Sequence, residues 1–148
     1  MNLKVCYSHK SDIWETPKDI YNYYVVKRGF FDPCPINPTF NGLEIEWEER
    51  NFVNPPYSQL SKWVDKALIE RAKGKLVIML IPARTDTKAF RRLYENKASF
   101  VFITGRLRFS EKNSAPFPSV FVILNDSDSQ LFRWIDKDCF KGGTENEN

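Results

Sequence analysis

Every residue from 76 to 81 is apolar, and the run reads Leu-Val-Ile-Met-Leu-Ile. A strand with one exposed face alternates apolar and polar residues, so a run without alternation is typical of a central strand covered on both faces. Helix-like patterns flank it: residues 59–73 precede the run and end at Gly74, and residues 87–95 follow it. The sequence therefore predicts an α/β fold with helices on both faces of a sheet.

Further helices and strands are predicted on either side of this run. A helix is expected to begin with Thr16 as its N-cap and Pro17 at its first position, and to end at Gly29. Apolar stretches between turn residues predict strands at residues 30–31, 51–53, 100–104, 106–109 and 119–124, and a short helix within residues 130–137. Because the late strands follow one another directly, we expect an antiparallel hairpin at the edge of a mostly parallel sheet.

Length and composition predict a single domain. The chain has 148 residues, 42% of them hydrophobic, and we expect residues 1–140 to fold as one unit, with the polar residues 141–148 as a disordered tail. No apolar run is long enough to cross a membrane and no signal peptide is apparent at residues 1–10, so we expect a cytoplasmic protein.

The cysteines and the net charge limit which metal sites and binding partners can be expected. Cys6, Cys34 and Cys139 are widely spaced and odd in number, which predicts reduced thiols and no metal site. The formal net charge of +3 is mildly basic and permits a nucleic-acid partner without requiring one.

The tetrapeptide Asn54-Pro55-Pro56-Tyr57 directly follows the predicted strand at residues 51–53. At ordinary residue usage it should arise by accident on the order of once per thousand chains of this length. The Asn54 oxygen and the Pro55 carbonyl are uncharged acceptors that could hold one amino group, and Tyr57 could stack on a planar base. Such a pocket fits an adenine turned out of its helix. The alternative is that the prolines only end a strand and Tyr57 caps the core.

Two acidic positions are further candidates. Asp32 follows the predicted strand at residues 30–31, and ligands of open α/β sheets bind at the carboxyl ends of strands. Glu46 and Trp47 could together hold an adenine moiety by hydrogen bonding and ring packing. Asp32 could instead only shape a turn before Pro33, and Glu46 could belong to a solvated acidic loop.

Several short blocks extend this pattern along the chain. They are Trp14-Glu15-Thr16-Pro17, Asp32-Pro33-Cys34, Asn54-Pro55-Pro56-Tyr57-Ser58, Pro82-Ala83-Arg84-Thr85-Asp86-Thr87, Gly105-Arg106-Leu107-Arg108-Phe109 and Asn113-Ser114-Ala115-Pro116-Phe117-Pro118-Ser119. In content and order they resemble the short phage DNA adenine methyltransferases, which use S-adenosylmethionine, over residues 11–124. Methyltransferase folds usually carry a glycine-rich loop after the first strand. This chain has prolines there, as the short phage enzymes do.

The resemblance implies a compact class I methyltransferase-like, Rossmann-like fold without a separate target-recognition domain. It implies that S-adenosylmethionine is held by Trp14, Thr16, Pro17, Asp32, Pro33 and Cys34, with Asp32 pairing with the cofactor's amino group. An acid before tryptophan is usual in the family, which favours Glu46 and Trp47 as further cofactor contacts. It also implies that Asn54, Pro55, Pro56 and Tyr57 hold the amino group of the target adenine.

Double-stranded DNA with a flipped adenine is the expected partner. Candidate phosphate contacts are Arg84, Lys88, Arg91, Arg106, Arg108 and Lys112. Phe117 could press on the second face of the target base or could be a core residue. Two alternatives stay open at this point: a protein-glutamine methyltransferase, whose substrate also presents a planar amide, and a binding module without turnover. Incubation of DNA, and then of protein, with a labelled methyl donor discriminates between these classes.

Overall fold

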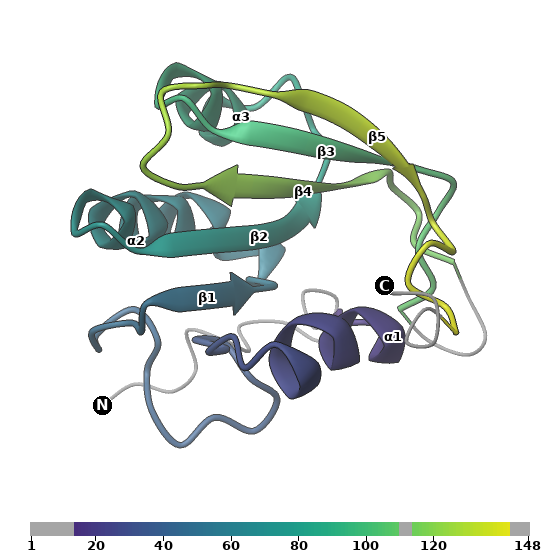
Figure 1. The fold of residues 1–148 in the computed structure, drawn as a ribbon, viewed down its shortest axis with the longest axis horizontal. Helices are drawn as coiled ribbons and strands as arrows, with labels where there is room; N and C mark the ends of the chain where they lie inside the picture. Colours follow the sequence, from purple (N-terminus) through teal and green to yellow (C-terminus); the bar gives the residue numbers. More distant parts are fainter. Residues whose placement is uncertain (1–13, 110–113, 143–148) are drawn as a thin grey trace.

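The computed structural model describes residues 14–109 and 114–142, and their strands form one five-stranded sheet (Figure 1). The strands are β1 (Arg50–Val53), β2 (Leu76–Pro82), β3 (Ser99–Thr104), β4 (Ser119–Leu124) and β5 (Phe132–Asp136). Their order across the sheet is β1-β2-β4-β3-β5. β1 pairs with β2 in parallel, β3 pairs with β5 in parallel, and β4 is antiparallel to both of its neighbours. Every strand except β4 therefore runs in the same direction.

The place of β4 corrects the predicted sheet. The antiparallel strand lies between β2 and β3, where the sequence predicted a hairpin at the edge. Burial explains the difference, because all but one of the side chains of β4 are buried and an edge strand would expose more of them. Residues 106–109 form no full strand and contribute only an isolated bridge between Arg108 and Ser114. Phe31 likewise makes a single parallel bridge, to Asn51.

The helix predicted within residues 130–137 is also wrong, because this segment is the edge strand β5. Its aromatic side chains stack across the strand pair: Phe132 lies 5.7 Å from Phe100, and Trp134 lies 4.7 Å from Phe102. Aromatic residues favour strands, and cross-strand ring pairs are a main source of sheet stability. Phe132 and Trp134 lie two residues apart, with Arg133 between them, which is the spacing of side chains on one face of a strand.

The helices begin and end close to the predicted positions. α1 (Lys18–Tyr21) continues as a π-helical segment (Asn22–Lys27), α2 (Leu60–Ala72) follows a 3-10 turn (Tyr57–Gln59), and α3 spans Lys88–Glu95. Gly29 and Gly74 have φ angles of +70° and +91°, which suit residues that end helices. Thr87 caps α3 by accepting the N–H of Phe90. Thr16 does not cap α1, because the N-cap position is Pro17.

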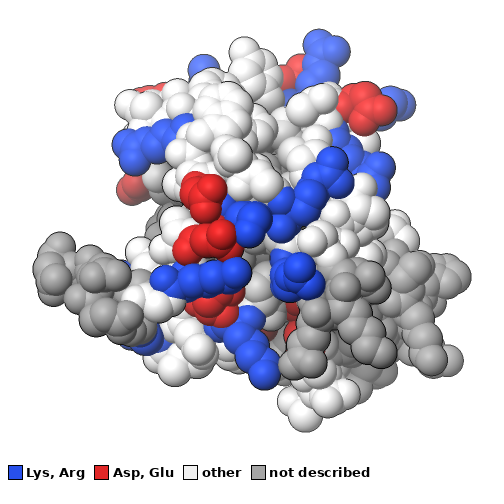
Figure 2. Space-filling view, turned by 90° about the vertical axis from the view of Figure 1, so that its right-hand side faces the viewer, with Lys and Arg blue, Asp and Glu red and all other residues white. Residues whose placement is uncertain are grey.

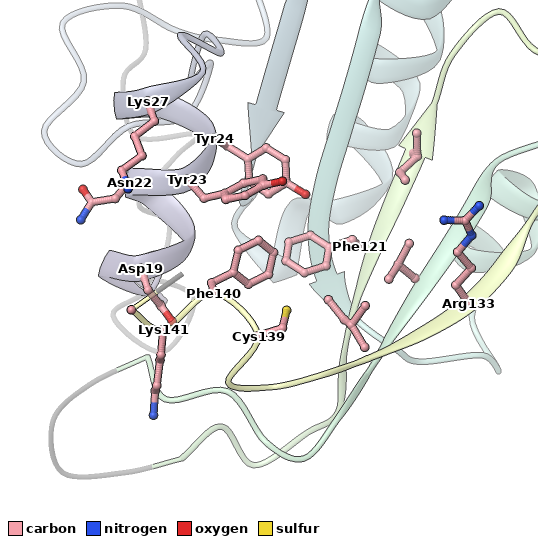
Figure 3. Close-up of a pocket in the computed structure, with 14 residues that line it drawn as sticks. Asp19, Asn22, Tyr23, Tyr24, Lys27, Phe121, Arg133, Cys139, Phe140 and Lys141 are labelled. Atoms are coloured by element: carbon pink, nitrogen blue, oxygen red, sulfur yellow. The ribbon is translucent and has the colours of Figure 1, made fainter. Parts of the chain in front are cut away.

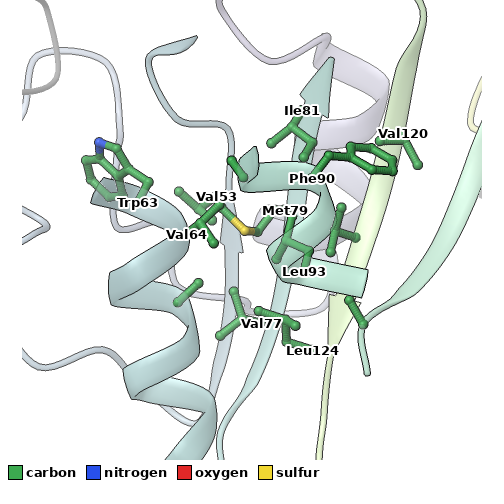
Figure 4. Packing of buried hydrophobic residues seen from close by; sticks show 14 of the residues in the cluster. Val53, Trp63, Val64, Val77, Met79, Ile81, Phe90, Leu93, Val120 and Leu124 are labelled. Carbon is green, nitrogen blue, oxygen red and sulfur yellow. The ribbon is translucent and has the colours of Figure 1, made fainter. Parts of the chain in front are cut away.

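Hydrophobic side chains fill both faces of the sheet. On one face, Trp63 and Val64 of α2 and Phe90 and Leu93 of α3 cover alternate residues of β1, β2 and β4 (Figure 4). On the other face, Ile20 of α1 packs with Phe30, Phe52, Leu80 and Phe121. β2 contributes to both clusters, which confirms that the apolar run forms a strand covered on both sides. No helix in the described part of the chain combines the length and apolarity needed to cross a bilayer.

A buried ion pair connects α2 to the start of β2. The Lys75 ammonium lies 2.5 Å from Oε1 of Glu70, and it also donates to the carbonyl oxygen of Trp47 at 2.6 Å. Lys66 approaches the other Glu70 oxygen to 2.8 Å. The Glu70 side chain has no exposed surface, so these partners compensate the removal of its charge from water.

Candidate functional site

The carboxyl edge of the sheet, where β1, β2, β3 and β5 end, brings several predicted residues together. Phe31 pairs in parallel with β1, since its N–H donates to Arg50 at 2.9 Å and its carbonyl accepts from Phe52 at 2.8 Å. Asp32 and Asn54 therefore leave the sheet at the same edge as the loop after β2, on the right in Figure 1. This is the edge at which α/β sheets bind ligands.

Asn54 is half-buried at this edge and has partners on both sides of its amide. Its Nδ2 donates to the carbonyl oxygen of Trp14 and, at 3.1 Å, to the hydroxyl of Thr16. Its Oδ1 accepts a longer bond, 3.4 Å, from the hydroxyl of Tyr57. A carbonyl-type oxygen has two lone pairs, so Oδ1 can accept a further hydrogen bond.

Aromatic rings surround this amide. Tyr57 lies edge-on to Phe117 with ring centroids 5.3 Å apart, and Trp14 lies edge-on to Phe117 at 5.4 Å. Phe117 is only 5% exposed, so it supports the rings of Trp14 and Tyr57 from within the core. Burial raises the pKa of the Tyr57 phenol, so this hydroxyl remains protonated at neutral pH. The prolines between Asn54 and Tyr57 are buried.

Asp32 presents a carboxylate in the turn that follows Phe31. One of its oxygens accepts the backbone N–H of Cys34 at 2.9 Å. Burial raises the pKa of Asp32 to about 6, although the bond from Cys34 acts in the opposite direction. Within residues 14–109 and 114–142, no Lys or Arg forms an ion pair with this carboxylate. A poorly solvated carboxylate of this kind favours a cationic ligand.

Gly42 holds the Asp32 turn in place, a role that no sequence pattern indicated. A Cβ atom on Gly42 would lie 2.0 Å from the carbonyl oxygen of Pro33 and 2.8 Å from the ring of Trp63. Only glycine allows the backbone at residue 42 to approach the turn this closely. The buried Pro33 and the half-buried Cys34 are thereby packed against the loop at residues 41–43.

The structure does not place Glu46 and Trp47 with the predicted cofactor residues. Trp47 is 2% exposed, it donates its indole N–H to the carbonyl of Gly42 at 2.7 Å, and its ring stacks on Trp63. No ring face is left for a ligand. Glu46 pairs with Lys75 at 3.3 Å and Lys73 at 3.9 Å. Trp47 therefore has a structural role, whereas the Glu46 side chain is 71% exposed and forms its ion pairs from the surface.

The predicted phosphate contacts have different surroundings. Arg84, Lys88, Arg106 and Arg108 are exposed on segments that leave or approach the carboxyl edge. The guanidinium of Arg84 lies 5.8 Å from the centroid of Phe117, which places it beside the aromatic rings. Arg91 is paired with Glu95 at 3.1 Å, and Lys112 lies outside the described residues. Figure 2 looks onto this edge and shows Lys and Arg side chains spread over it, with Asp and Glu among them.

A separate pocket of about 780 Å³ lies on the α1 face of the sheet (Figure 3). Tyr23, Tyr24, Phe121 and Phe140 contribute aromatic surface to it, and Arg133 lies at its far side. None of the predicted site residues lines this pocket. The candidate site is therefore the carboxyl edge, where the predicted residues meet.

The chemistry available at the carboxyl edge is polar and uncharged around Asn54, and anionic at Asp32. An amide oxygen beside aromatic rings can hold a planar amino group, while the carboxylate can hold a cation. In the described ranges no three His, Cys, Asp or Glu side chains lie close enough to hold a metal ion. The arrangement therefore suits a reaction between a planar amine and a positively charged reagent.

Comparisons with known proteins point to one family. The family model described as DNA N-6-adenine-methyltransferase (Dam) matches residues 5–130. A curated protein of Escherichia phage T1, named DNA N-6-adenine-methyltransferase, is 27% identical over 110 residues, which cover 65% of this chain and 46% of that protein. The chain thus spans about half the length of this relative. No solved structure matches the chain.

Proposed function

The chain belongs to the DNA N-6-adenine-methyltransferase family, and we propose that it transfers a methyl group from S-adenosylmethionine to the exocyclic amino group of adenine in double-stranded DNA. The observation that carries this proposal is the shared edge of Asn54 and Asp32. One residue offers an uncharged acceptor and the other a carboxylate, as the two reactants require. The common direction of β1, β2, β3 and β5 further supports a class I methyltransferase-like fold.

The residues of this edge fit S-adenosylmethionine as the methyl donor. Asp32 would pair with the amino group of the cofactor, since its carboxylate has no cationic partner among the described residues. Pro33 and Cys34 would contact it from the same turn, and Trp14, Thr16 and Pro17 from the segment before α1. Trp47 is not part of this proposal, because its ring is buried and its indole N–H is bonded to Gly42, whereas Glu46, with an exposed side chain, would remain a further contact.

Asn54 would act on the second reactant, an adenine turned out of the duplex. Its Oδ1 and the Pro55 carbonyl would accept the hydrogens of the amino group, which makes the nitrogen more electron-rich and aligns its lone pair. Tyr57 would stack on the base, a contact worth roughly 1–3 kcal/mol. When bound, S-adenosylmethionine would supply an activated methyl carbon. The nitrogen–carbon bond would form as the carbon–sulfur bond breaks, the electron pair of the broken bond would stay on sulfur, and the nitrogen would then lose a proton to water.

Basic side chains would hold the DNA against this edge. Arg84, Lys88, Arg106 and Arg108 are exposed and would contact phosphates, with Lys112 as a further candidate from the sequence. Arg91 should contribute less, because it is paired with Glu95. Phe117 would act from beneath the rings of Trp14 and Tyr57 and would not contact the base face directly.

Incubation of the purified chain with unmethylated duplex DNA and S-adenosylmethionine labelled in its methyl group tests the proposal. After digestion to nucleosides, the label should elute with N6-methyldeoxyadenosine. Label on a protein glutamine, with none on DNA, would support the amide-methylating alternative. Cofactor binding measured by calorimetry, with no transfer to DNA or protein, would instead indicate a binding module.

A further inference from the structure

Two residues of the segment before α1 reach the amide of Asn54 across a gap of about forty residues in the sequence. Trp14 offers its backbone carbonyl and Thr16 its hydroxyl, and both accept hydrogens from Nδ2. We propose that Trp14 and Thr16 are positioning residues that fix the orientation of the Asn54 amide for methyl transfer. This inference rests on the proposed function, and it assigns the Thr16 hydroxyl to Asn54, so that any contact of residue 16 with the cofactor would come from its other atoms.

The partners of Asn54 determine which way its amide points. A backbone carbonyl can accept a hydrogen bond but cannot donate one, so the NH2 group must face Trp14. The Thr16 hydroxyl occupies the second hydrogen of the same NH2 group. Oδ1 consequently faces the opposite direction, toward the hydroxyl of Tyr57. If the amide were turned by half a rotation, its NH2 group would meet the amino group of adenine, and two donors would face each other.

The two positioning residues are themselves held by the fold. The Trp14 ring packs edge-on against Phe109 at 5.7 Å and Phe117 at 5.4 Å, which fixes the backbone that carries its carbonyl. Pro17 directly follows Thr16 and begins the hydrogen bonding of α1, because its carbonyl oxygen accepts the N–H of Tyr21 at 2.9 Å. The segment is thus anchored at both ends, and Thr16 directs its hydroxyl to Asn54 while Pro17 occupies the N-cap.

This arrangement makes residue 54 specific for asparagine. An aspartate would also present an oxygen that can accept a hydrogen bond from adenine, so the need for an acceptor does not by itself exclude aspartate at this position. Its second oxygen, however, would face the Trp14 carbonyl, and two acceptors without a hydrogen between them repel each other. Asn54→Asp should therefore lose transfer even though an acceptor remains.

Two matched variants of Thr16 test the proposal. Thr16→Val removes the hydroxyl at nearly constant volume, and kcat for methyl transfer should fall about tenfold, the effect of losing one hydrogen bond. Thr16→Ser retains the hydroxyl and should stay within about twofold of the unmodified chain. Cofactor affinity, measured by calorimetry, should be unchanged in both variants. Thr39→Val, at an exposed threonine outside the site, controls for the substitution itself.

Three results of kinetic and binding measurements would overturn the proposal. Undiminished kcat in Thr16→Val would show that the hydroxyl does not position Asn54. A fall in cofactor affinity that accounts for the whole loss would make Thr16 a cofactor contact. Asn54→Asp with activity close to that of the unmodified chain would exclude the proposed constraint from Trp14.

Nuclear magnetic resonance of the Asn54 side chain tests the same proposal without turnover. Its two amide hydrogens, assigned by their disappearance in Asn54→Ala, should exchange slowly with water in the free protein. Thr16→Val should speed the exchange of one of them, and Thr16→Ser should not. Fast exchange in the unmodified chain would overturn the inference. If the unmodified chain transfers no methyl group but shows the protected amide, the proposed function fails and the positioning contact stands.

Discussion

In the proposed reaction, Asn54 would supply a neutral hydrogen-bond acceptor and Asp32 a negative charge at the carboxyl edge. The Nδ2 atom of Asn54 is held by Trp14 and Thr16, which leaves Oδ1 able to accept a further hydrogen bond. The Asp32 carboxylate accepts the N–H of Cys34 and forms no ion pair with a described Lys or Arg. A charged acceptor near the amino group would hold it in the ground state as well as in the transition state. A neutral oxygen that gains strength as the nitrogen becomes positive favours the transition state.

Replacing Asn54 by alanine should separate catalysis from cofactor binding. Asn54→Ala removes the oxygen that accepts the adenine amino group, so kcat should fall by at least about a hundredfold, as for the loss of other preorganised polar contacts. Cofactor affinity should stay within a few fold, because Asp32 is intact. Single-turnover transfer and calorimetry measure the two effects. Equal losses in both would mean that Asn54 serves the cofactor.

Asp32 should couple cofactor binding to pH. Its pKa of about 6 in the folded chain lies above the ordinary value of 3.8, so the folded state binds the proton more tightly and loses stability as pH rises through 6. Cofactor affinity should change in the opposite direction and weaken below pH 6, as the carboxylate becomes protonated. Affinity that is flat between about pH 5 and 8 would contradict this role.

Asp32→Asn should weaken cofactor binding and raise the free energy of unfolding. The amide still accepts the N–H of Cys34 but carries no charge, so the variant should be more stable at pH 8 by about 2 kcal/mol and should bind the cofactor poorly. Denaturant unfolding and calorimetry at the same pH provide both quantities. Asp86→Asn, at an exposed carboxylate, should change neither of them.

At the scale of elements, the polar segment before β1 is tied to α2 and β2 by a buried charge. Glu70 accepts from Lys66, from Lys75 and from the backbone N–H of Trp47. Burial alone would raise the pKa of Glu70, but these hydrogen bonds hold it at about 2. Trp47 also donates to Gly42, which lies against the Asp32 turn at Pro33, so the ion pair is connected to the site through Trp47 and Gly42.

Glu70→Gln should destabilise the fold by about 3 kcal/mol, because it leaves the buried Lys75 ammonium with only the exposed Glu46 carboxylate as a counter-charge. Urea unfolding at pH 7 measures this loss. The sign with pH follows from the lowered pKa: the stabilisation is complete above the ordinary value of 4.5 and is lost as pH falls toward 2, so the two proteins should become more alike in acid. Glu95→Gln, at an exposed pair, should cost less than about 1 kcal/mol. A similar cost for both variants would exclude the buried pair as a main support.

Local signals explain which elements could be predicted from the sequence. Gly29 and Gly74 end helices because glycine readily adopts the positive φ angle found there. The apolar run of β2 directly indicates that its side chains are buried. The position of β4 depends on pairings with β2 and β3, which no local pattern contains. β5 was missed because a short segment with Leu131, Trp134 and Ile135 also fits helical spacing, and its ring partners lie about thirty residues earlier.

For the whole molecule, the direction of the strands creates the candidate site. Parallel pairing of Phe31, β1 and β2 brings Asp32 and Asn54 to one edge, and this much followed from the sequence once the strands were recognised. The core position of Trp47 did not follow from the sequence, because the charged residues around it do not indicate whether its side chain is buried. The contacts from Trp14 and Thr16 to Asn54 were also missed, since Thr16 has the spacing of a helix cap.

The exposed cations of the carboxyl edge should determine how DNA binding depends on salt. Arg84→Gln should weaken duplex binding at 100 mM salt and lower the slope of log K against log salt by about 0.9, the change for one phosphate contact. Lys97→Asn removes a cation from the turn between α3 and β3, at the opposite edge, and suits its φ of +67°. Fluorescence anisotropy over about 50–200 mM salt measures both. Equal effects of the two substitutions would mean that the DNA is not held at the carboxyl edge.

We propose that Asn54, at the carboxyl edge, directs methyl transfer to adenine in DNA. The most direct measurement is the N6-methyldeoxyadenosine content of DNA from cells that lack adenine methylation of their own and express either the unmodified chain or Asn54→Ala. We expect the modified nucleoside in the first DNA and none in the second, at equal amounts of folded protein. Methylation in both, or in neither, would contradict it.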